Sequence, residues 1–167
     1  MSPADDSYLL IDLGGQAFAL PMGSVREVLP LPVLDRQPPW PKILAGMINL
    51  RGQAMPVLDL GLLLNAGADR ETTDLYAHIV RVVGRGGAQL GLLVDRVTDA
   101  QMPADGFKPA EPDESPNGAA LGHLRFGERL VPLLAPDRLL LLEEAARIEE
   151  ITAALADRRQ AVSEGRS

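Results

Sequence analysis

Residues Gly46 to Leu60 read GMINLRGQAMPVLDL, and this stretch is the most informative one for the fold. Two apolar runs, 46–50 and 53–58, lie on either side of Arg51-Gly52. Glycine accepts the positive φ that a tight turn between antiparallel strands requires. The stretch therefore predicts a β-hairpin. Pro56 has no N–H to donate to a neighbouring strand, so it predicts an edge position or a bulge within the second run.

Three further pairs of short apolar runs surround this hairpin, each with glycine at its junction. They are 8–13 with 16–20, 75–83 with 88–96, and 121–125 with 130–134. Short strands at this spacing, separated by glycine turns, predict a small all-β barrel. Both halves of the chain show paired hairpins, so the pattern also allows two similar barrels.

From Pro136 onward the pattern changes to that of a helix. Proline suits the first turn of a helix, and Asp137 is favourable at the positive end of the helix dipole. Ile148, Ile151 and Leu155 recur at i, i+3 and i+7, which makes a narrow apolar stripe. Two interpretations stay open: the stripe lies on the protein's own barrel, or it docks onto a partner.

The remaining segments are expected to be less regular. Residues 25–29 predict either a strand or a helical turn. The prolines that follow exclude a helix and favour an extended edge segment and loop over 31–41. Trp40 is expected to anchor that loop to the core rather than to recognise a ligand. Residues 101–118 predict a long loop.

Composition excludes several classes of function. The chain has 167 residues with 16 Lys+Arg against 23 Asp+Glu, a formal net charge of −7, so it repels phosphate backbones and no nucleic acid is expected as a partner. It has no cysteine, which removes disulfides and thiolate chemistry. No apolar run approaches the roughly 20 residues of a membrane span, and the N-terminus is acidic. We expect a cytoplasmic protein without direct membrane insertion.

Patterns typical of enzymes are scarce. His78 and His123 stand alone in predicted strands, without a second histidine at metal spacing, so no metal is expected. Asp59 admits two interpretations: the catalytic aspartate of a dimeric aspartic protease, or the cap of a short helical turn. Leu60 stands where such a protease needs Ser or Thr, which favours the cap.

The stretch around Arg51 resembles the CheW family of chemotaxis coupling proteins. The family pattern is G-apolar-x-N-apolar-R-G-x-apolar-x-P-apolar-apolar-D-L, and GMINLRGQAMPVLDL follows it in order. The resemblance continues upstream in FALP (18–21) and VREV (25–28) and downstream in GLLVDRVTD (91–99). It spans about residues 8–142.

The resemblance implies a fold and a domain organisation. The fold would be mainly β, with two intertwined five-stranded SH3-like β-barrel subdomains and a C-terminal helix. Residues 1–7 would be a disordered N-terminus, 8–142 a single domain of two barrels, and 143–167 a helix and flexible tail. The loop 101–118 looks shorter and more acidic than in familiar members, and the stretch beyond Glu143 is longer.

The function implied is that of a non-catalytic adaptor, with no substrate and no cofactor. It would bridge the cytoplasmic tip of a methyl-accepting chemoreceptor and the regulatory domain of a chemotaxis histidine kinase, at membrane-associated arrays. The departures leave open a kinase-binding member of a pilus, surface-sensing or second-messenger pathway, and a competitor that binds a kinase but no receptor. A generic SH3-like peptide binder ranks low, because such grooves are aromatic and only 4% of residues are aromatic.

The resemblance also implies partner-binding residues. Glu27 and Arg51 match a family pair that faces each other near the receptor contact, and a guanidinium can hold a carboxylate through two hydrogen bonds. The other expected residues are two glycines that the backbone needs, an asparagine that bonds to the turn, and three valines of the groove or core. These are Gly46, Gly52, Asn49, Val25, Val94 and Val97.

Overall fold

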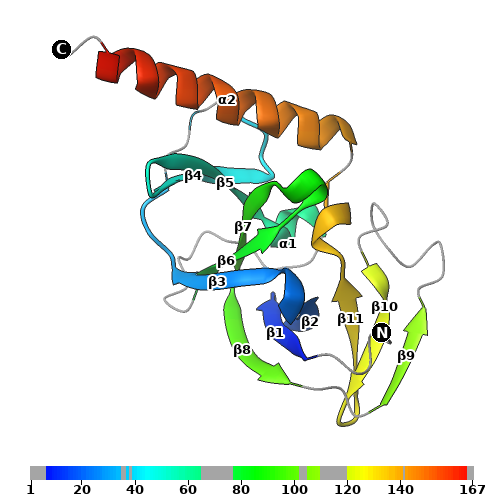
Figure 1. The fold of residues 1–167 in the computed structure, drawn as a ribbon. Helices are drawn as coiled ribbons and strands as arrows, with labels where there is room; N and C mark the ends of the chain where they lie inside the picture. The colour runs from blue at the N-terminus through cyan, green and yellow to red at the C-terminus, as the bar shows by residue number, and fades with distance from the viewer. Residues whose placement is uncertain are drawn as a thin grey trace.

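The computed structural model describes residues 7–34, 37, 39–64, 77–101, 105–109, 120–140 and 142–164. Within them, strands form two sheets and a long helix ends the chain (Figure 1). The first sheet has the order β8-β1-β2-β11-β10-β9, and the second β3-β6-β7-β5-β4. The bounds in the first sheet are β1 Tyr8–Leu13, β2 Gln16–Pro21, β8 Arg96–Gln101, β9 Asp105–Pro109, β10 Ala120–Phe126 and β11 Arg129–Leu134. Those in the second are β3 Val25–Pro30, β4 Leu44–Leu50, β5 Gln53–Asp59, β6 His78–Val83 and β7 Gln89–Val94.

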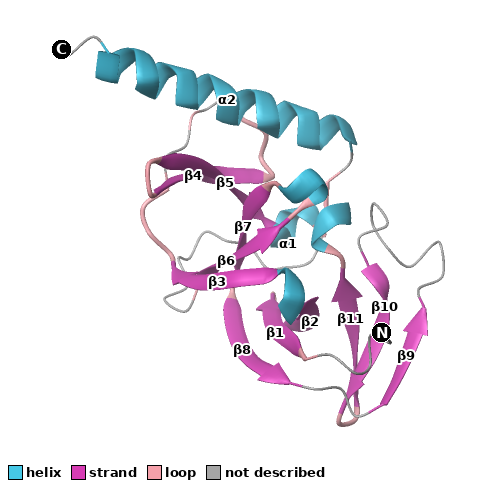
Figure 2. Cartoon of the chain, in the orientation of Figure 1, coloured by secondary structure: helices cyan, strands magenta, loops and turns pink. Residues whose placement is uncertain are grey.

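The two sheets are intertwined along the chain. The first sheet takes its strands from both ends of the sequence, while β3 to β7 form the second sheet between them. Parallel pairing of β11 with β2, and of β5 with β7, brings segments distant in sequence together. The prediction of a mainly β fold with two β subdomains and a C-terminal helix is confirmed. Figure 2 shows β3 to β7 above most strands of the first sheet in this view.

The first sheet has more strands than predicted. β9 lies within residues 101–118, which were predicted to be a loop; most of the rest of that stretch is outside the described residues. β8 follows β7 after Asp95 alone, whereas the apolar run 88–96 predicted one strand ending at Arg96. The predicted disorder at 1–7 likewise lies outside the described residues, apart from Ser7, whose carbonyl accepts a hydrogen bond from the Met22 N–H.

The predicted hairpin around Arg51-Gly52 is confirmed, with Leu50 opposite Gln53. β5 is nevertheless an internal strand, so the edge position predicted from Pro56 is wrong for the strand as a whole. The proline is accommodated because the parallel pairing of β5 with β7 begins only at Val57. Pro56 thus lies in the half of β5 that pairs with β4 alone.

β3 resolves the ambiguity of residues 25–29 in favour of a strand, paired with β6. The loop that follows returns to the core at Trp40, which is half-buried and packs against the main apolar cluster. The predicted anchoring role of Trp40 is therefore confirmed.

One apolar cluster is shared by the two sheets. Ile11 and Leu20 enter it from the first sheet, and Val80 and Leu92 from the second. Leu139, which follows β11, is also buried in this cluster. Burying each such side chain contributes about 1.5–3 kcal/mol, so the cluster binds the sheets into one unit.

The C-terminal helix α2, Leu142–Glu164, begins later than predicted, because Pro136–Arg138 form a separate 3₁₀ turn. Ile148 is buried, and Ile151 and Leu155 pack against the shared cluster. The apolar stripe therefore lies on the protein's own barrel. Figure 1 shows α2 crossing over β4 and β5. Of the described helices, none is both long and apolar enough to cross a membrane.

Gly91 provides a test of the packing between β5, β6 and β7. A Cβ added there would lie 2.8 Å from Ile79 Cγ2 and 3.2 Å from Val57 Cγ2. We expect Gly91→Ala to lower the free energy of unfolding by about 1–3 kcal/mol, because neighbours must shift in a close-packed interior. Denaturant unfolding measures the change. Gly23→Ala is the matched control, since a Cβ there meets nothing within 4 Å; equal losses in both variants would contradict this account.

Candidate partner-binding site

The β4–β5 turn has an unusual residue at its first central position. Arg51 has φ 54° and Gly52 has φ 86°, the signs of a type I′ turn. Among the described residues, Arg51 is the one non-glycine residue with positive φ. Arginine in this left-handed region costs about 1–2 kcal/mol, and Asn is the residue that such a turn prefers here.

The surrounding turn compensates for this strain. The Gly52 N–H donates a hydrogen bond to Asn49 Oδ1 at 2.9 Å. This confirms the predicted role of Asn49, which holds the turn through a side-chain-to-backbone bond. Gly52 supplies the second positive φ, as expected for a backbone requirement. The hairpin thus holds Arg51 at its tip in a defined conformation.

The Arg51 side chain is exposed. Within the part of the chain that the structure describes, its guanidinium has no recorded hydrogen bond or ion pair. The expected pairing of Arg51 with Glu27 is therefore wrong for this structure.

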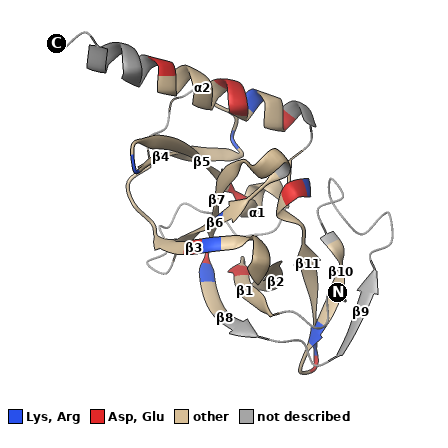
Figure 3. Ribbon diagram, in the orientation of Figure 1, with Lys and Arg blue, Asp and Glu red and all other residues tan. Residues whose placement is uncertain are grey.

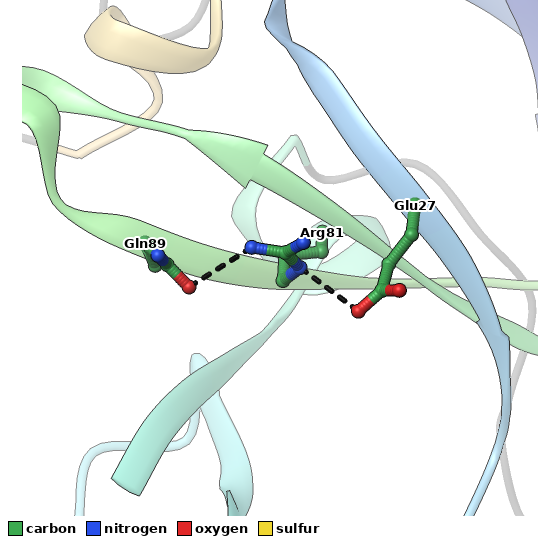
Figure 4. Close-up of polar contacts among 3 residues, drawn as sticks. All are labelled: Glu27, Arg81 and Gln89. Carbon is green, nitrogen blue, oxygen red and sulfur yellow. Dashed lines mark hydrogen bonds and ion pairs between the residues drawn. The ribbon is translucent and has the colours of Figure 1, made fainter. Parts of the chain in front are cut away.

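Glu27 pairs instead with Arg81 (Figure 4). Arg81 Nε lies 3.0 Å from Glu27 Oε1, and the side chains of Arg81 and Glu27 are 15% and 30% exposed. A second guanidinium nitrogen of Arg81 donates to Gln89 Oε1 at 3.1 Å. The three side chains form a row across β3, β6 and β7.

The physical reason for this pairing is the register of the sheet. Glu27 on β3 lies directly opposite Arg81 on β6, and opposed residues on antiparallel strands have Cβ atoms about 4.5–5.5 Å apart. Residues 75–83 were already a predicted strand, so the opposite charges were a usable signal. The sequence does not show that β3 pairs with β6. Glu27 and Arg81 are 54 residues apart in the sequence.

The predicted valines divide between core and surface. Val94 is fully buried in the shared cluster, so it packs the core and does not reach the surface. Val25 and Val97 are half-buried and pack against the same cluster from β3 and β8. Gly46 is buried on β4, beside the register shift between Leu44 and Gly46.

Asp59 is buried, with 7% of its surface exposed. Its Oδ1 accepts a hydrogen bond from the Leu62 N–H at 3.2 Å, which caps α1, Leu60–Leu63. The predicted cap is confirmed. An aspartic protease instead needs two carboxylates facing each other at an open dyad, and a buried capping carboxylate does not supply one.

A groove of about 660 Å³ lies beside the Arg51 turn, between α2 and β5. Apolar side chains from several elements line most of it, including Leu50, Ala54, Leu90, Leu140 and Ile148. Its charged lining residues are Asp137 and Glu149. Figure 3 shows the strands of the second sheet largely uncharged, with many of the described charges on α2.

Comparison with known proteins agrees with this geometry. The structure of the scaffolding protein TtCheW from Thermoanaerobacter tengcongensis superposes with a TM-score of 0.73 at 22% identity, covering 83% of this chain and 90% of that one. This likeness shows the fold, and the class that results is a double-barrel β domain of the TtCheW type.

The family follows from the sequence matches. Residues 7–144 match the family model of the CheW-like domain, and the chain belongs to this family of chemotaxis coupling and scaffold proteins. The probable chemotaxis protein CheW of Rhizobium etli is 28% identical over 142 residues, which are 83% of this chain and 90% of that one. The chemotaxis protein CheW of Klebsiella aerogenes is 28% identical over 148 residues, 86% and 87% of the two chains.

The strained turn predicts that Arg51→Asn stabilises the protein. Asparagine tolerates the left-handed region, so we expect the free energy of unfolding to rise by about 0.5–1 kcal/mol. Denaturant unfolding measures it, with Arg129→Asn as the control on an exposed arginine whose φ is not positive. A loss of stability in Arg51→Asn would show that the arginine contributes more to folding than its geometry indicates.

The ion pair predicts a selective coupling. In a double-mutant cycle of Glu27→Ala and Arg81→Ala we expect a coupling free energy of about 0.2–1 kcal/mol, as for opposed charges on neighbouring strands. The cycle of Glu27→Ala with Arg51→Ala should give about zero. Thermal or denaturant unfolding of the single and double variants decides between the two arginines, and the reverse ranking would restore the pairing implied by the family resemblance.

Proposed function

We propose that this protein is a non-catalytic adaptor that couples the cytoplasmic tip of a chemoreceptor to the regulatory domain of a chemotaxis histidine kinase. Its relatives are named chemotaxis protein CheW, and a structural neighbour is titled a scaffolding protein. The observation that supports the proposal best is the state of Arg51, which is exposed, strained and free of a recorded intramolecular partner among the described residues.

Arg51 is unfavourable for the conformation of the turn but well suited to binding an acidic group. A turn that asparagine would stabilise carries arginine instead, and backbone strain of this kind is found preferentially where function requires a residue. No described residue accepts a hydrogen bond from the guanidinium, and a guanidinium matches an external carboxylate in geometry and charge. Arg51 is therefore assigned to an acidic side chain of the receptor.

Glu27 has a different role from the one first expected, because it pairs with Arg81 and not with Arg51. Its bond to Arg81 orients the carboxylate on the sheet surface, while the side chain stays partly accessible. Val25 and Val97 supply half-buried apolar surface from the two sheets. Gly46, Asn49 and Gly52 shape the hairpin that presents Arg51, and Val94 supports the surface from the core.

A second candidate is a member of a pilus, surface-sensing or second-messenger pathway that uses the same kind of kinase. The length of α2, 23 residues, is the observation that favours a departure from the swimming pathway. Together with β5, α2 borders an apolar groove that a different partner could use. The identity of the kinase and receptor that bind decides between the two candidates.

Binding to isolated partners tests the proposal. We expect the wild-type protein to bind both the kinase regulatory domain and a receptor-tip fragment from the same organism in calorimetric titrations. Arg51→Ala should weaken receptor binding about tenfold, about 1.4 kcal/mol, because one charge-assisted contact is lost. Kinase binding and the unfolding midpoint should change little.

Arg129→Ala is the matched control, because Arg129 is also an exposed arginine but lies on the first sheet. Receptor affinity that is equal in Arg51→Ala, Arg129→Ala and wild type would refute the role of Arg51. A wild-type chain that binds neither fragment would refute the adaptor function itself.

A further inference from the structure

Asp95 occupies the point where the chain passes from the second sheet to the first. It is the one residue between the end of β7 at Val94 and the start of β8 at Arg96. Its backbone N–H donates to the Asp12 carbonyl at 3.1 Å. Its side chain accepts a hydrogen bond from the Gly14 N–H, with Asp95 Oδ2 2.6 Å from the nitrogen. Asp12 and Gly14 belong to β1 and to the β1–β2 turn of the first sheet.

The strand that leaves this point is irregular in a way that supports the same contact. The register between β1 and β8 shifts between Leu10 and Ile11, so that Leu10 faces Asp99 and Ile11 faces Val97. Thr98 is the extra residue, and its hydroxyl donates to the Leu10 carbonyl at 3.1 Å. A bulge of this kind bends a strand and turns it relative to its partner.

The shared apolar cluster does not by itself determine how the sheets are oriented. Apolar burial is non-directional and rewards contact area, so it holds the sheets together over a range of angles. Hydrogen bonds to a carboxylate are directional and stronger than neutral ones. The bonds of Asp95 link the exit of the second sheet to a turn of the first, where a change of angle would break them.

We propose that Asp95 is a positioning residue that fixes the orientation of the two sheets, and thereby the shape of the partner-binding surface. The inference rests on the proposed function, because the candidate contact residues come from both sheets. Glu27 and Arg51 belong to the second sheet, and Val97 to the first, two residues after Asp95. A partner that touches both sheets recognises an orientation and not only a set of side chains.

The Gly14–Asp95 hydrogen bond lies at the surface, so its effect on sheet orientation can be distinguished from an effect on the stability of the fold. The hydrogen bond between Gly14 and Asp95 is exposed to solvent, so water can satisfy the Gly14 N–H when the carboxylate is removed. Asp95→Ala should therefore lower the unfolding midpoint only slightly, while it loosens the angle between the sheets. A residue that only stabilised the fold would change the midpoint and leave the angle alone.

Pulsed electron paramagnetic resonance on the full chain measures the orientation directly. The protein has no cysteine, so spin labels can be attached at Leu62→Cys on α1 and Leu130→Cys on β11. These side chains are 55% and 56% exposed and belong to the two different halves of the molecule. We expect a single narrow distance distribution in the labelled parent and a distribution at least twice as broad in Asp95→Ala.

Two conservative variants sharpen the test. Asp95→Asn keeps an oxygen that accepts from Gly14 and should restore the narrow distribution. Asp95→Glu keeps the charge but lengthens the side chain by one methylene, so it should shift the distance while the protein stays folded. The proposal is overturned if Asp95→Ala and Asp95→Glu both give the same distance distribution as the labelled parent. It is also overturned if the distribution of Asp95→Asn is as broad as that of Asp95→Ala.

Receptor binding gives the second measurement and keeps this proposal separate from the adaptor function. Affinity for the receptor-tip fragment should fall about tenfold in Asp95→Ala and recover in Asp95→Asn. If the parent binds no receptor, the adaptor function fails while the distance distributions still decide the role of Asp95. If the sheets loosen and receptor affinity stays unchanged, the link between sheet orientation and binding is overturned.

Discussion

The burial of one apolar cluster between two sheets is the constraint on which the rest of the structure depends. The chain enters the second sheet after β2 and returns to the first after β7, so the first sheet is built from two pieces of sequence with the second sheet inserted between them. Leu13 and Leu134, from opposite ends of the chain, lie in the same cluster as Val80 and Leu92. A sheet removed from this arrangement would expose the apolar face that it now buries, and the two halves are therefore expected to unfold together.

This core limits where function can be placed. Positions whose side chains enter the cluster, such as Val94 and Asp59's neighbour Leu60, are occupied by packing. The opposite face of the second sheet is also buried, in a cluster that includes Ile79, Val57 and Leu93, so recognition is left to the turns and to exposed strand positions. The Arg51 turn is such a place. The long β4–β5 pairing and the hydrogen bond from Gly52 to Asn49 make the hairpin stable enough to contain a strained residue. Marginal local strain is tolerated where the surrounding contacts determine the backbone.

Local patterns in the sequence predicted local structure well. Glycines at 14–15 and 52 lie between apolar runs, and each marks a hairpin that the structure contains. The cap at Asp59 and the apolar stripe of α2 were predicted for the same reason, since both depend on residues a few positions apart. β8 and β9 were not predicted. β8 is separated from β7 by Asp95 alone, and β9 lies in a stretch of proline, acid and glycine without an alternating pattern. The partner of Glu27 depends on which strands are neighbours, which is a property of the topology and has no signal in the hairpins themselves.

Arg51 and Arg81 show that the partner of Glu27 is determined by the position of each arginine in the folded sheet and not by its place in the family's sequence pattern. Both are arginines of the second sheet, and the family pattern singles out Arg51 as the partner of Glu27. Arg81 takes that role because it lies opposite Glu27 and is held from the other side by Gln89. Most of the stretch from Gly46 to Leu60 can then be understood as a folding unit: Gly46 at a register shift, Asn49 and Gly52 in the turn, and Asp59 as a cap. Its exposed and strained member is Arg51, and a unit folded this way has one charged side chain to offer a partner.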